Sequence, residues 1–353
     1  MKKSVGPAIL MVFLLLYPRF AAEGARYGLL LWYTAVVPSL FPFMVLSSLI
    51  VSSGGVSLLM KPVRSLLAPW LPLSENGFYT LASGLLCGCP MGAKTCGDFV
   101  REGRLSVREG RFLMAICNHP SPMFLLGFVC PLFGSQMQPS RLLLSIYLPL
   151  LPLADLARRI YFPARKKTAG LQPPPPEPSS EDLQPPDLRD PAAGEPRNPV
   201  PAPALDTAIL AAAEILCRIG GYLMLFSILI VFLRHAQWLP VPLRLLLIGA
   251  MEMTTGVREL AASLPFPGSG AAAAAALAFG GVCGVFQTRS VIVSGRPESQ
   301  KTCTRTSGAR RMGGEGSGED KKIAGLSIRQ YILWKLLHSG LAAAVFLLLG
   351  LLG

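Results

Sequence analysis

The chain has 353 residues, of which 51% are hydrophobic and only 15% are charged, and its mean hydropathy is +0.47. Water alone does not solvate a chain of this composition, which excludes an ordinary soluble protein and indicates membrane integration. The net charge of +13 would favour a nucleic-acid partner in a soluble protein, but here the basic residues lie in loops beside apolar runs, where they orient a protein in a bilayer.

Seven apolar runs approach the ~20 residues that a helix needs to cross the hydrocarbon. No strand-period pattern is present, so helices are expected to satisfy the backbone in lipid. The runs are residues 5–20, 28–52, 112–133, 142–160, 208–233, 271–293 and 331–352. The first run is either a cleaved signal peptide, because small residues follow it at 21–25, or an uncleaved first helix, which fits the many spans that follow.

Two further apolar stretches, residues 78–95 and 241–257, are interrupted by Gly, Pro and charge. Lys61 and Arg64 precede the first stretch, and four arginines follow it between residues 101 and 111. If both loops face the cytoplasm, the stretch enters and leaves the membrane on the same side. This pattern predicts a re-entrant hairpin made of a broken helix.

The middle of the chain separates two halves. Basic residues from Arg158 to Lys167 indicate a cytoplasmic location, and residues 163–206 contain 13 prolines in 44 positions. This composition predicts a disordered Pro-rich cytoplasmic linker, with a ligand for proline-reading domains as the alternative. We therefore expect an N-terminal membrane repeat at 1–162 and a C-terminal one at 207–353, the latter with a polar loop insertion at 294–322.

The two halves predict an inverted repeat. Each has a long span, a broken stretch and a further span, and Gly92 and Lys94 can be aligned with Gly256 and Arg258. The loop after the first broken stretch holds four arginines, whereas residues 259–270 hold no Lys or Arg, so the equivalent loops should lie on opposite sides of the membrane. Arg234 and Arg244, on the predicted outer side, are the exceptions.

Polar residues cluster where the helices are expected to break. A break at membrane depth leaves backbone groups that only a protein-lined or watery cavity can satisfy, and half-helix amino termini can bind an anionic group there. The candidate substrate-binding residues are Pro90, Gly92, Lys94, Asn118, Ser121, Glu252, Thr254, Thr255 and Gln287.

Charged members of this set are expected to be functional, because a charge at membrane depth is costly unless it is paired or hydrated. Lys94 and Glu252 either serve the solute, or lie near helix ends and extend toward the membrane surface, or pair with each other. His119 is either a hydrogen-bonded structural histidine or a proton-coupling group.

Three other chemistries fit the sequence less well. Residues 88–95 nearly match a phosphate-binding loop, but Ala93 stands at the second glycine and no strand precedes it. No nucleophile, base and orienting group form a recognisable hydrolase set, so we expect no enzyme and no cofactor. A metal pathway stays an alternative, with spacings that match no standard zinc pattern, through Cys87, Cys89, Cys96, Cys117 and His119.

Several short motifs resemble one known family. They are Pro-Ser-Leu-Phe-Pro-Phe at 38–43, Gly-Cys-Pro-Met-Gly-Ala at 88–93, Cys-Asn-His-Pro-Ser-Pro-Met-Phe at 117–124, Glu-Met-Thr-Thr-Gly at 252–256, Phe-Gly-Gly at 279–281 and Lys-Leu-Leu-His at 335–338. In their order and spacing the chain resembles the sporulation integral membrane proteins of spore-forming Firmicutes, which carry the nucleoside-recognition (Gate) domain and are related to concentrative nucleoside transporters.

The resemblance implies a two-repeat transporter that acts in endospore formation, where the family is associated with moving dipicolinic acid across the outer forespore membrane. It also implies a small-molecule substrate and allows a coupling ion. Cys89 and Met91 replace an aromatic and a small hydroxyl residue of the expected pattern, which leaves the substrate open. The alternative outside transport is a membrane assembly or signalling protein with the same fold.

Overall fold

The computed structural model describes residues 5–163, 205–294 and 325–352. Within these ranges every regular element is a helix, which confirms the predicted all-α class. The predicted linker at 163–206 and the polar insertion at 294–322 lie almost wholly outside the described residues, so both stay predictions.

The first half runs through fourteen short or long elements. They are α1 (Val5–Leu16), α2 (Pro18–Leu31), the π-helix η1 (Trp32–Val36), α3 (Val37–Ser52), α4 (Val56–Leu67), α5 (Glu75–Cys87), α6 (Met91–Arg101), α7 (Val107–Ile116), α8 (Pro122–Phe124), the π-helix η2 (Leu125–Val129), α9 (Cys130–Phe133), the 3-10 helix η3 (Gly134–Gln136), α10 (Pro139–Tyr147) and α11 (Leu150–Tyr161).

The second half is simpler. Its elements are α12 (Leu205–His235), α13 (Val241–Met251), α14 (Met253–Ser263), α15 (Gly268–Phe279), α16 (Gly281–Ser294) and α17 (Ile328–Leu352). Both halves contain two long helical segments with two interrupted ones between them, and their relation as an inverted repeat stays a prediction. Among the described residues, five segments are long and apolar enough to cross a membrane: Pro18–Ser52, Pro139–Tyr161, Leu205–His235, Gly268–Ile292 and Ile328–Leu351.

The amino-terminal spans differ from the prediction of separate runs at 5–20 and 28–52. The helix breaks at Tyr17, and Pro18 opens a continuous helical segment that reaches Ser52. Proline is favoured at the first helical position, where its missing N–H has no partner to lose. Residues 21–25, considered as a cleavage region, belong to this helix.

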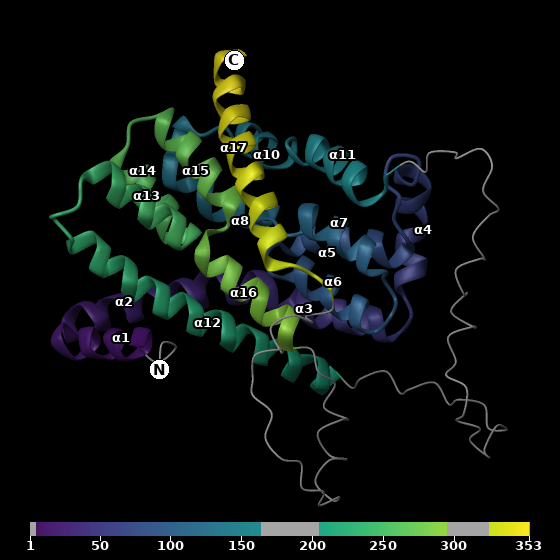
Figure 1. The fold of residues 1–353 in the computed structure, drawn as a ribbon, viewed down its shortest axis with the longest axis horizontal. Coiled ribbons are helices and arrows are strands. Elements are labelled where there is room, and N and C mark those ends of the chain that lie inside the picture. Colours follow the sequence, from purple (N-terminus) through teal and green to yellow (C-terminus); the bar gives the residue numbers. More distant parts are fainter. Residues whose placement is uncertain (1–4, 164–204, 295–324, 353) are drawn as a thin grey trace, which may run out of the picture.

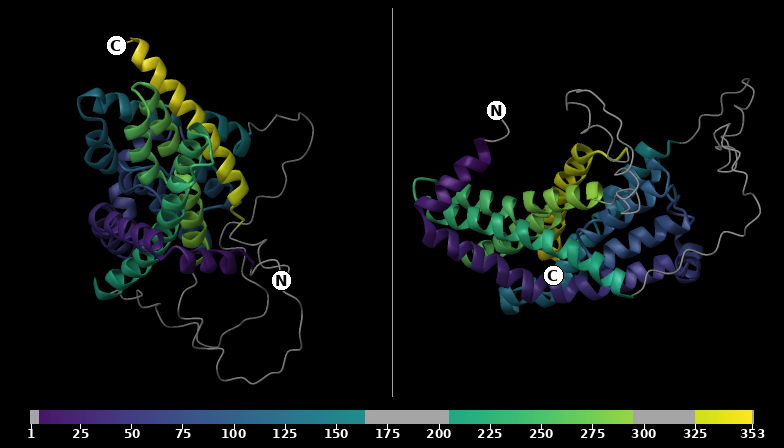
Figure 2. Two further views of the ribbon diagram at one scale, coloured as in Figure 1. Left: turned by 90° about the vertical axis from the view of Figure 1, so that its left-hand side faces the viewer. Right: turned by 90° about the horizontal axis from the view of Figure 1, so that it is seen from below.

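The helix pair α2 and α12 explains why small residues occur in the middle of α2. A Cβ on Gly24 would lie 2.5 Å from the Cα of Ile228, and one on Gly28 would lie 2.8 Å from the Cα of Met224. The two backbones therefore approach as closely as helices do in membranes at small-residue contacts. Figure 2 shows α2 and α12 running side by side.

The run at 112–133, predicted as one span, is also interrupted. Helix α7 ends at Ile116, residues 117–121 are not helical, and α8 begins at Pro122. Pro120 and Pro122 account for this break, because proline removes an N–H donor and disfavours the helical conformation of the residue before it. The run at 271–293 breaks likewise at Gly280 and Gly281, whose φ angles are +81° and +73°.

The two predicted hairpins lie toward opposite ends of the molecule. At one end, Arg64 pairs with Glu75 at the start of α5 (3.0 Å), and Arg101 at the end of α6 donates to the carbonyl oxygen of Ile292 (2.7 Å). At the other end, the α13–α14 hairpin is fixed by an ion pair between Arg234 of α12 and Glu259 of α14. Figure 1 shows α4 and α6 toward the right and α13 and α14 at the left.

Candidate functional site

The four helix breaks meet at one small cavity. The cavity has a volume of about 50 Å³ and receives residues from every break. These residues are Gly88 and Cys89 from the α5–α6 break, Pro120 and Ser121 from the α7–α8 break, Glu252 from the α13–α14 break and Gly280 from the α15–α16 break. Segments that lie far apart in the sequence therefore build a single site.

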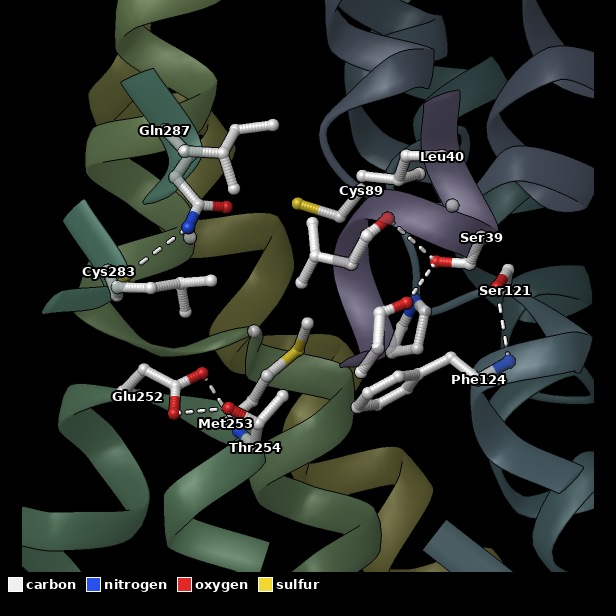
Figure 3. A pocket seen from close by; sticks show the side chains of 18 of the residues that line it. Ser39, Leu40, Cys89, Ser121, Phe124, Glu252, Met253, Thr254, Cys283 and Gln287 are labelled. Carbon is white, nitrogen blue, oxygen red and sulfur yellow. Dashed lines mark hydrogen bonds between the residues drawn. The ribbon is translucent and has the colours of Figure 1, made fainter. Parts of the chain in front are cut away.

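The rest of the wall comes from the paired long helices and from α14 and α16. It contains Ala35, Val36, Ser39, Leu40, Phe124, Ile219, Leu223, Met253, Thr254, Cys283, Gly284 and Gln287, with Cys87 at the end of α5. Figure 3 shows Glu252, Cys283 and Gln287 on one wall, with Ser39, Ser121 and Phe124 on the wall opposite. Polar side chains of both halves thus face a mostly apolar pocket.

Glu252 caps α14 with its own carboxylate. It is 2% exposed, its backbone is extended, and its side chain accepts hydrogen bonds from the backbone N–H groups of Thr254 (2.9 Å) and Thr255 (2.8 Å). The Thr254 hydroxyl donates to the same carboxylate. The anionic group expected at this half-helix amino terminus is therefore supplied by the protein itself, and the helix dipole and amides stabilise it.

Ser121 and Gln287 are the other predicted residues that line the cavity with Glu252 and Thr254. The Ser121 hydroxyl accepts from the Phe124 N–H (3.3 Å) and caps α8, while the Gln287 amide donates to the Cys283 sulfur (3.3 Å). The Gln287 carbonyl oxygen remains available to a bound molecule, as does the hydrogen of the Ser121 hydroxyl.

Four predicted residues are buried around the cavity without lining it. Pro90 precedes α6, and Thr255 is 1% exposed with no partner for its hydroxyl among the described residues. Gly92 packs against the α7–α8 break, since a Cβ there would lie 2.0 Å from the carbonyl oxygen of Cys117. The Asn118 amide donates to Thr288, Tyr331 and the sulfur of Cys89, of which Cys89 lines the cavity.

Lys94 does not belong to this site. It lines a separate cavity of about 340 Å³ between α3, α6 and α12, and its Nζ pairs with Asp98 at 2.8 Å. The predicted alternative of a pair between Lys94 and Glu252 is wrong as well, because Asp98 on the same helix is the partner. Lys94 is four residues before Asp98, so the two side chains lie on one face of α6.

We expect Lys94→Ala to leave solute binding unchanged and to lower stability by less than about 0.5 kcal/mol. The reason is that its side chain is 29% exposed and that partly exposed ion pairs four residues apart contribute little. Thermal unfolding with and without solute measures both effects. Asp98→Asn is the comparison variant, because it also removes the 2.8 Å pair between Asp98 and Arg101. If Lys94→Ala impairs solute binding and Asp98→Asn does not, Lys94 takes part in solute binding.

A third cavity lies at the opposite end of the molecule. It measures about 310 Å³ and is lined by Arg234, Val241, Arg244, Leu245, Ile248, Glu259 and Ser263. Buried apolar residues lie beside each of these cavities: Met44 and Met91 line the Lys94 cavity and pack with Leu40 and Cys87 of the central cavity, and Ile248 lies one helical turn before Glu252. The central cavity is thus flanked by a charged hollow at each end.

Sequence reasoning identified Gln287 of α16 but not the other buried polar residues of α16 and α17 around Asn118. Lys335 is 2% exposed and His338 is 0% exposed, and Thr288 and Tyr331 bond to Asn118. The sequence indicates Lys335 and His338 only through the Lys-Leu-Leu-His motif of the family resemblance. The signal that identifies Lys335 is a lysine inside an otherwise apolar run at 331–352, which membrane energetics marks as functional.

The cysteines of the alternative metal pathway are buried or half-buried free thiols. Across residues 5–163, 205–294 and 325–352, no three His, Cys, Asp or Glu side chains gather in a way that could hold a metal ion. Cys96, for example, donates to the carbonyl oxygen of Gly110 at 3.4 Å and is fully buried among apolar residues. A buried cysteine at such a position serves as a small apolar side chain in the packed core.

The chain is similar to a curated membrane protein. The sporulation integral membrane protein YlbJ of Bacillus subtilis (strain 168) is 28% identical over 218 residues, which cover 60% of this chain and 51% of that protein. The chain therefore spans about half the length of this relative. No protein-family model and no solved structure matches the chain. The match supports a relation to sporulation integral membrane proteins and a multi-pass membrane location, while the Gate domain stays a prediction.

Proposed function

We propose that this protein is a secondary transporter or facilitator that moves a small polar or anionic organic solute across a membrane during endospore formation. The observation that carries the proposal is the convergence of four helix breaks, two from each half, on one partly polar cavity. The relative's name as a sporulation protein supports the biological setting. The proposal places the protein in the cell membrane as a multi-pass protein. In a spore-former, this membrane would be the outer forespore membrane.

The breaks favour transport because they are costly at membrane depth. Each one exposes backbone N–H and C=O groups that lipid cannot satisfy, so such breaks persist where they line a cavity or are buried in protein. Paired hairpins of opposite direction with interrupted helices are the usual architecture of a site that can be reached from either side. A protein with only a scaffold role has no such need for irregular backbone at its centre.

The small volume of the cavity indicates a closed conformation. A space of about 50 Å³ holds a few water molecules, so an organic solute enters only when the surrounding helices separate. Met44 and Met91 block the way to one end, and Ile248 blocks the way to the other. Alternate separation at these two barriers would expose the site first to one side and then to the other.

The cavity wall favours a solute with both hydrogen-bond donors and acceptors. Its polar groups include the Ser121 hydroxyl, the Gln287 amide and the Glu252 carboxylate, the last of which already accepts bonds from α14. Phe124, Leu40 and Ile219 provide apolar surface for a flat ring. Dipicolinate is the first solute to test because the family resemblance implies it, and nucleosides are the second.

Reconstitution into proteoliposomes tests the proposal directly. We expect saturable uptake of one solute from a panel of dipicolinate, nucleosides and divalent metal ions, and we expect that solute to raise the unfolding temperature of the purified protein, since it binds only the folded state. Uptake should fall at least about tenfold in Glu252→Gln, in keeping with the 1.5–3 kcal/mol that a hydrogen bond to a charged group contributes.

The competing functions give different outcomes in the same assay. Lys94→Ala is the control variant, since its pair with Asp98 lies outside the central cavity. Metal uptake that is lost in Cys89→Ala would replace the proposal by a metal pathway. Binding of a protein partner without flux of any panel member would favour an assembly or signalling role.

A further inference from the structure

A buried polar network lies behind the central cavity, next to α17. Lys335 is 2% exposed, and its Nζ donates a hydrogen bond of 2.9 Å to the backbone carbonyl oxygen of Asn118. Its Cε lies 3.8 Å from the position that a Cβ on Gly280 would occupy. The ammonium group therefore sits between the α7–α8 break of one half and the α15–α16 break of the other, and both breaks reach the cavity.

The Asn118 side chain extends this network to α16 and makes a second contact with α17. Its amide donates to the Thr288 hydroxyl of α16 (3.0 Å) and to the Tyr331 hydroxyl of α17 (2.7 Å). Its carbonyl oxygen is buried and has no hydrogen-bond partner among the described residues. Helix α16 also carries Cys283 and Gln287 of the cavity wall, so the network connects the ammonium group to the surface that a solute would touch.

A lysine in this position is not explained by an ion pair or by exposure. In the part of the chain that the structure describes, no carboxylate lies within ion-pair distance of Lys335, and the backbone carbonyl of Asn118 is its hydrogen-bond partner. At 2% exposure the side chain does not reach water at a membrane surface, as lysines near helix ends do. The positive charge of Lys335 is stabilised only by neutral backbone dipoles, which lie just beyond the carboxyl end of α7.

Unwound carbonyls and half-helix carboxyl ends are the groups that bind coupling cations in transporters of this architecture. We propose that Lys335 fills such a cation site as a tethered ammonium ion, so that solute movement is coupled to the gain and loss of its proton and is independent of Na⁺. The coupling part rests on the transport function proposed above, whereas the occupied cation site does not.

The proton balance of this step is simple. When the cavity is open to one side, the ammonium group releases H⁺ to water and becomes a neutral amine; it takes up H⁺ again from the other side. Loss of the charge weakens the contact with the Asn118 carbonyl and releases residues 117–121 from α17. The titratable groups that face Lys335 from the packed elements are Cys89, Cys117, His119, Tyr331 and His338.

Thermal unfolding in detergent tests the cation site without any flux. We compare NaCl with choline chloride at equal ionic strength. Wild type should unfold at the same temperature in both salts, because the ammonium group already occupies the site. Lys335→Ala leaves the backbone carbonyl of Asn118 without its cation, and Na⁺ should raise the unfolding temperature of this variant by a few degrees. Stabilisation of wild type by Na⁺, or no response in either protein, overturns the cation site.

Uptake in Na⁺-free proteoliposomes tests the coupling. In wild type, a gradient of two pH units can drive accumulation of up to about 100-fold for one proton per solute, since each unit is a tenfold ratio. Lys335→Met and Lys335→Arg should lose this response, because methionine carries no proton and arginine does not release one. Lys94→Met is the matched control and should keep the response, since Lys94 pairs with Asp98 outside the site.

The outcomes separate this inference from the proposed function. A pH-driven response that persists in Lys335→Arg, or that requires Na⁺ in wild type, overturns the coupling. Should Lys335→Met fail to fold, the arginine variant keeps the charge and decides the question. If no solute moves in any variant, including wild type, the transport function fails and the coupling with it, while the salt dependence of unfolding still reports whether Lys335 fills a cation site.

Discussion

Glu252→Ala is expected to abolish solute uptake and to lower the free energy of unfolding by about 2–4 kcal/mol. The carboxylate satisfies two backbone N–H groups at the amino terminus of α14, those of Thr254 and Thr255, and it accepts the Thr254 hydroxyl as well. Loss of a helix cap costs ~1 kcal/mol, and each buried donor left without a partner costs ~1–3 kcal/mol. Since α14 starts inside the cavity wall, its first turn would also lose its position.

Glu252→Gln distinguishes the contribution of the helix cap from that of the negative charge. The glutamine carbonyl oxygen can still accept from one N–H group, so we expect it to lose roughly half as much stability as the alanine variant while uptake falls strongly. Glu214→Ala is the control, because Glu214 is an exposed residue of α12 that pairs with Arg218. Unfolding temperature and initial uptake rate are measured for all three. Equal values for Glu252→Ala and Glu214→Ala would mean that Glu252 has no special role.

Much of the fold was predictable because hydropathy and local breakers report it directly. The α13–α14 break at Glu252 and the α5–α6 break around Pro90 fall inside stretches that the sequence marks as interrupted. The break at 117–121 was predicted only in part: the polar residues there were expected at a break, but the flanking run of apolar residues is long enough to be counted as one span. The helix that continues from Pro18 to Ser52 was predicted as two runs because Gly24 and Gly28 interrupt the apolar pattern. In the structure these glycines allow close packing against α12 and do not end a helix.

The two lysines show why the site was harder to predict than the fold. Lys94 follows a break by only one turn, and the sequence places it at membrane depth, but Asp98 lies four residues later and pairs with it. Lys335 lies in a run that reads as a plain span, and nothing local shows that it reaches a carbonyl group of residue 118. Proximity across 217 positions of sequence is a tertiary fact, which composition and periodicity do not contain.

The contact between Gly92 and the α7–α8 break makes a second strong prediction. A Cβ on Gly92 would lie 2.0 Å from the carbonyl oxygen of Cys117, and one on Gly84 would lie 1.7 Å from the same atom. Both neighbours are backbone, so Gly92→Ala forces α6 and the break apart by about 1 Å, which typically costs 1–3 kcal/mol. We expect a fall in unfolding temperature of roughly 5 °C, at 2–4 °C per kcal/mol for a chain of this size.

The same displacement should impair solute binding more than it impairs folding. Cys89 and Ser121 lie on the two segments that Gly92 holds together, and both line the cavity. A shift of 1 Å in positioning groups can cost about 100-fold in function. Gly221→Ala is the matched control, because a Cβ there meets nothing within 4 Å and alanine favours the α12 helix by up to about 1 kcal/mol. Equal unfolding temperatures and equal uptake in the two variants would show that the four breaks do not depend on close backbone contact, and the cavity would then need another explanation.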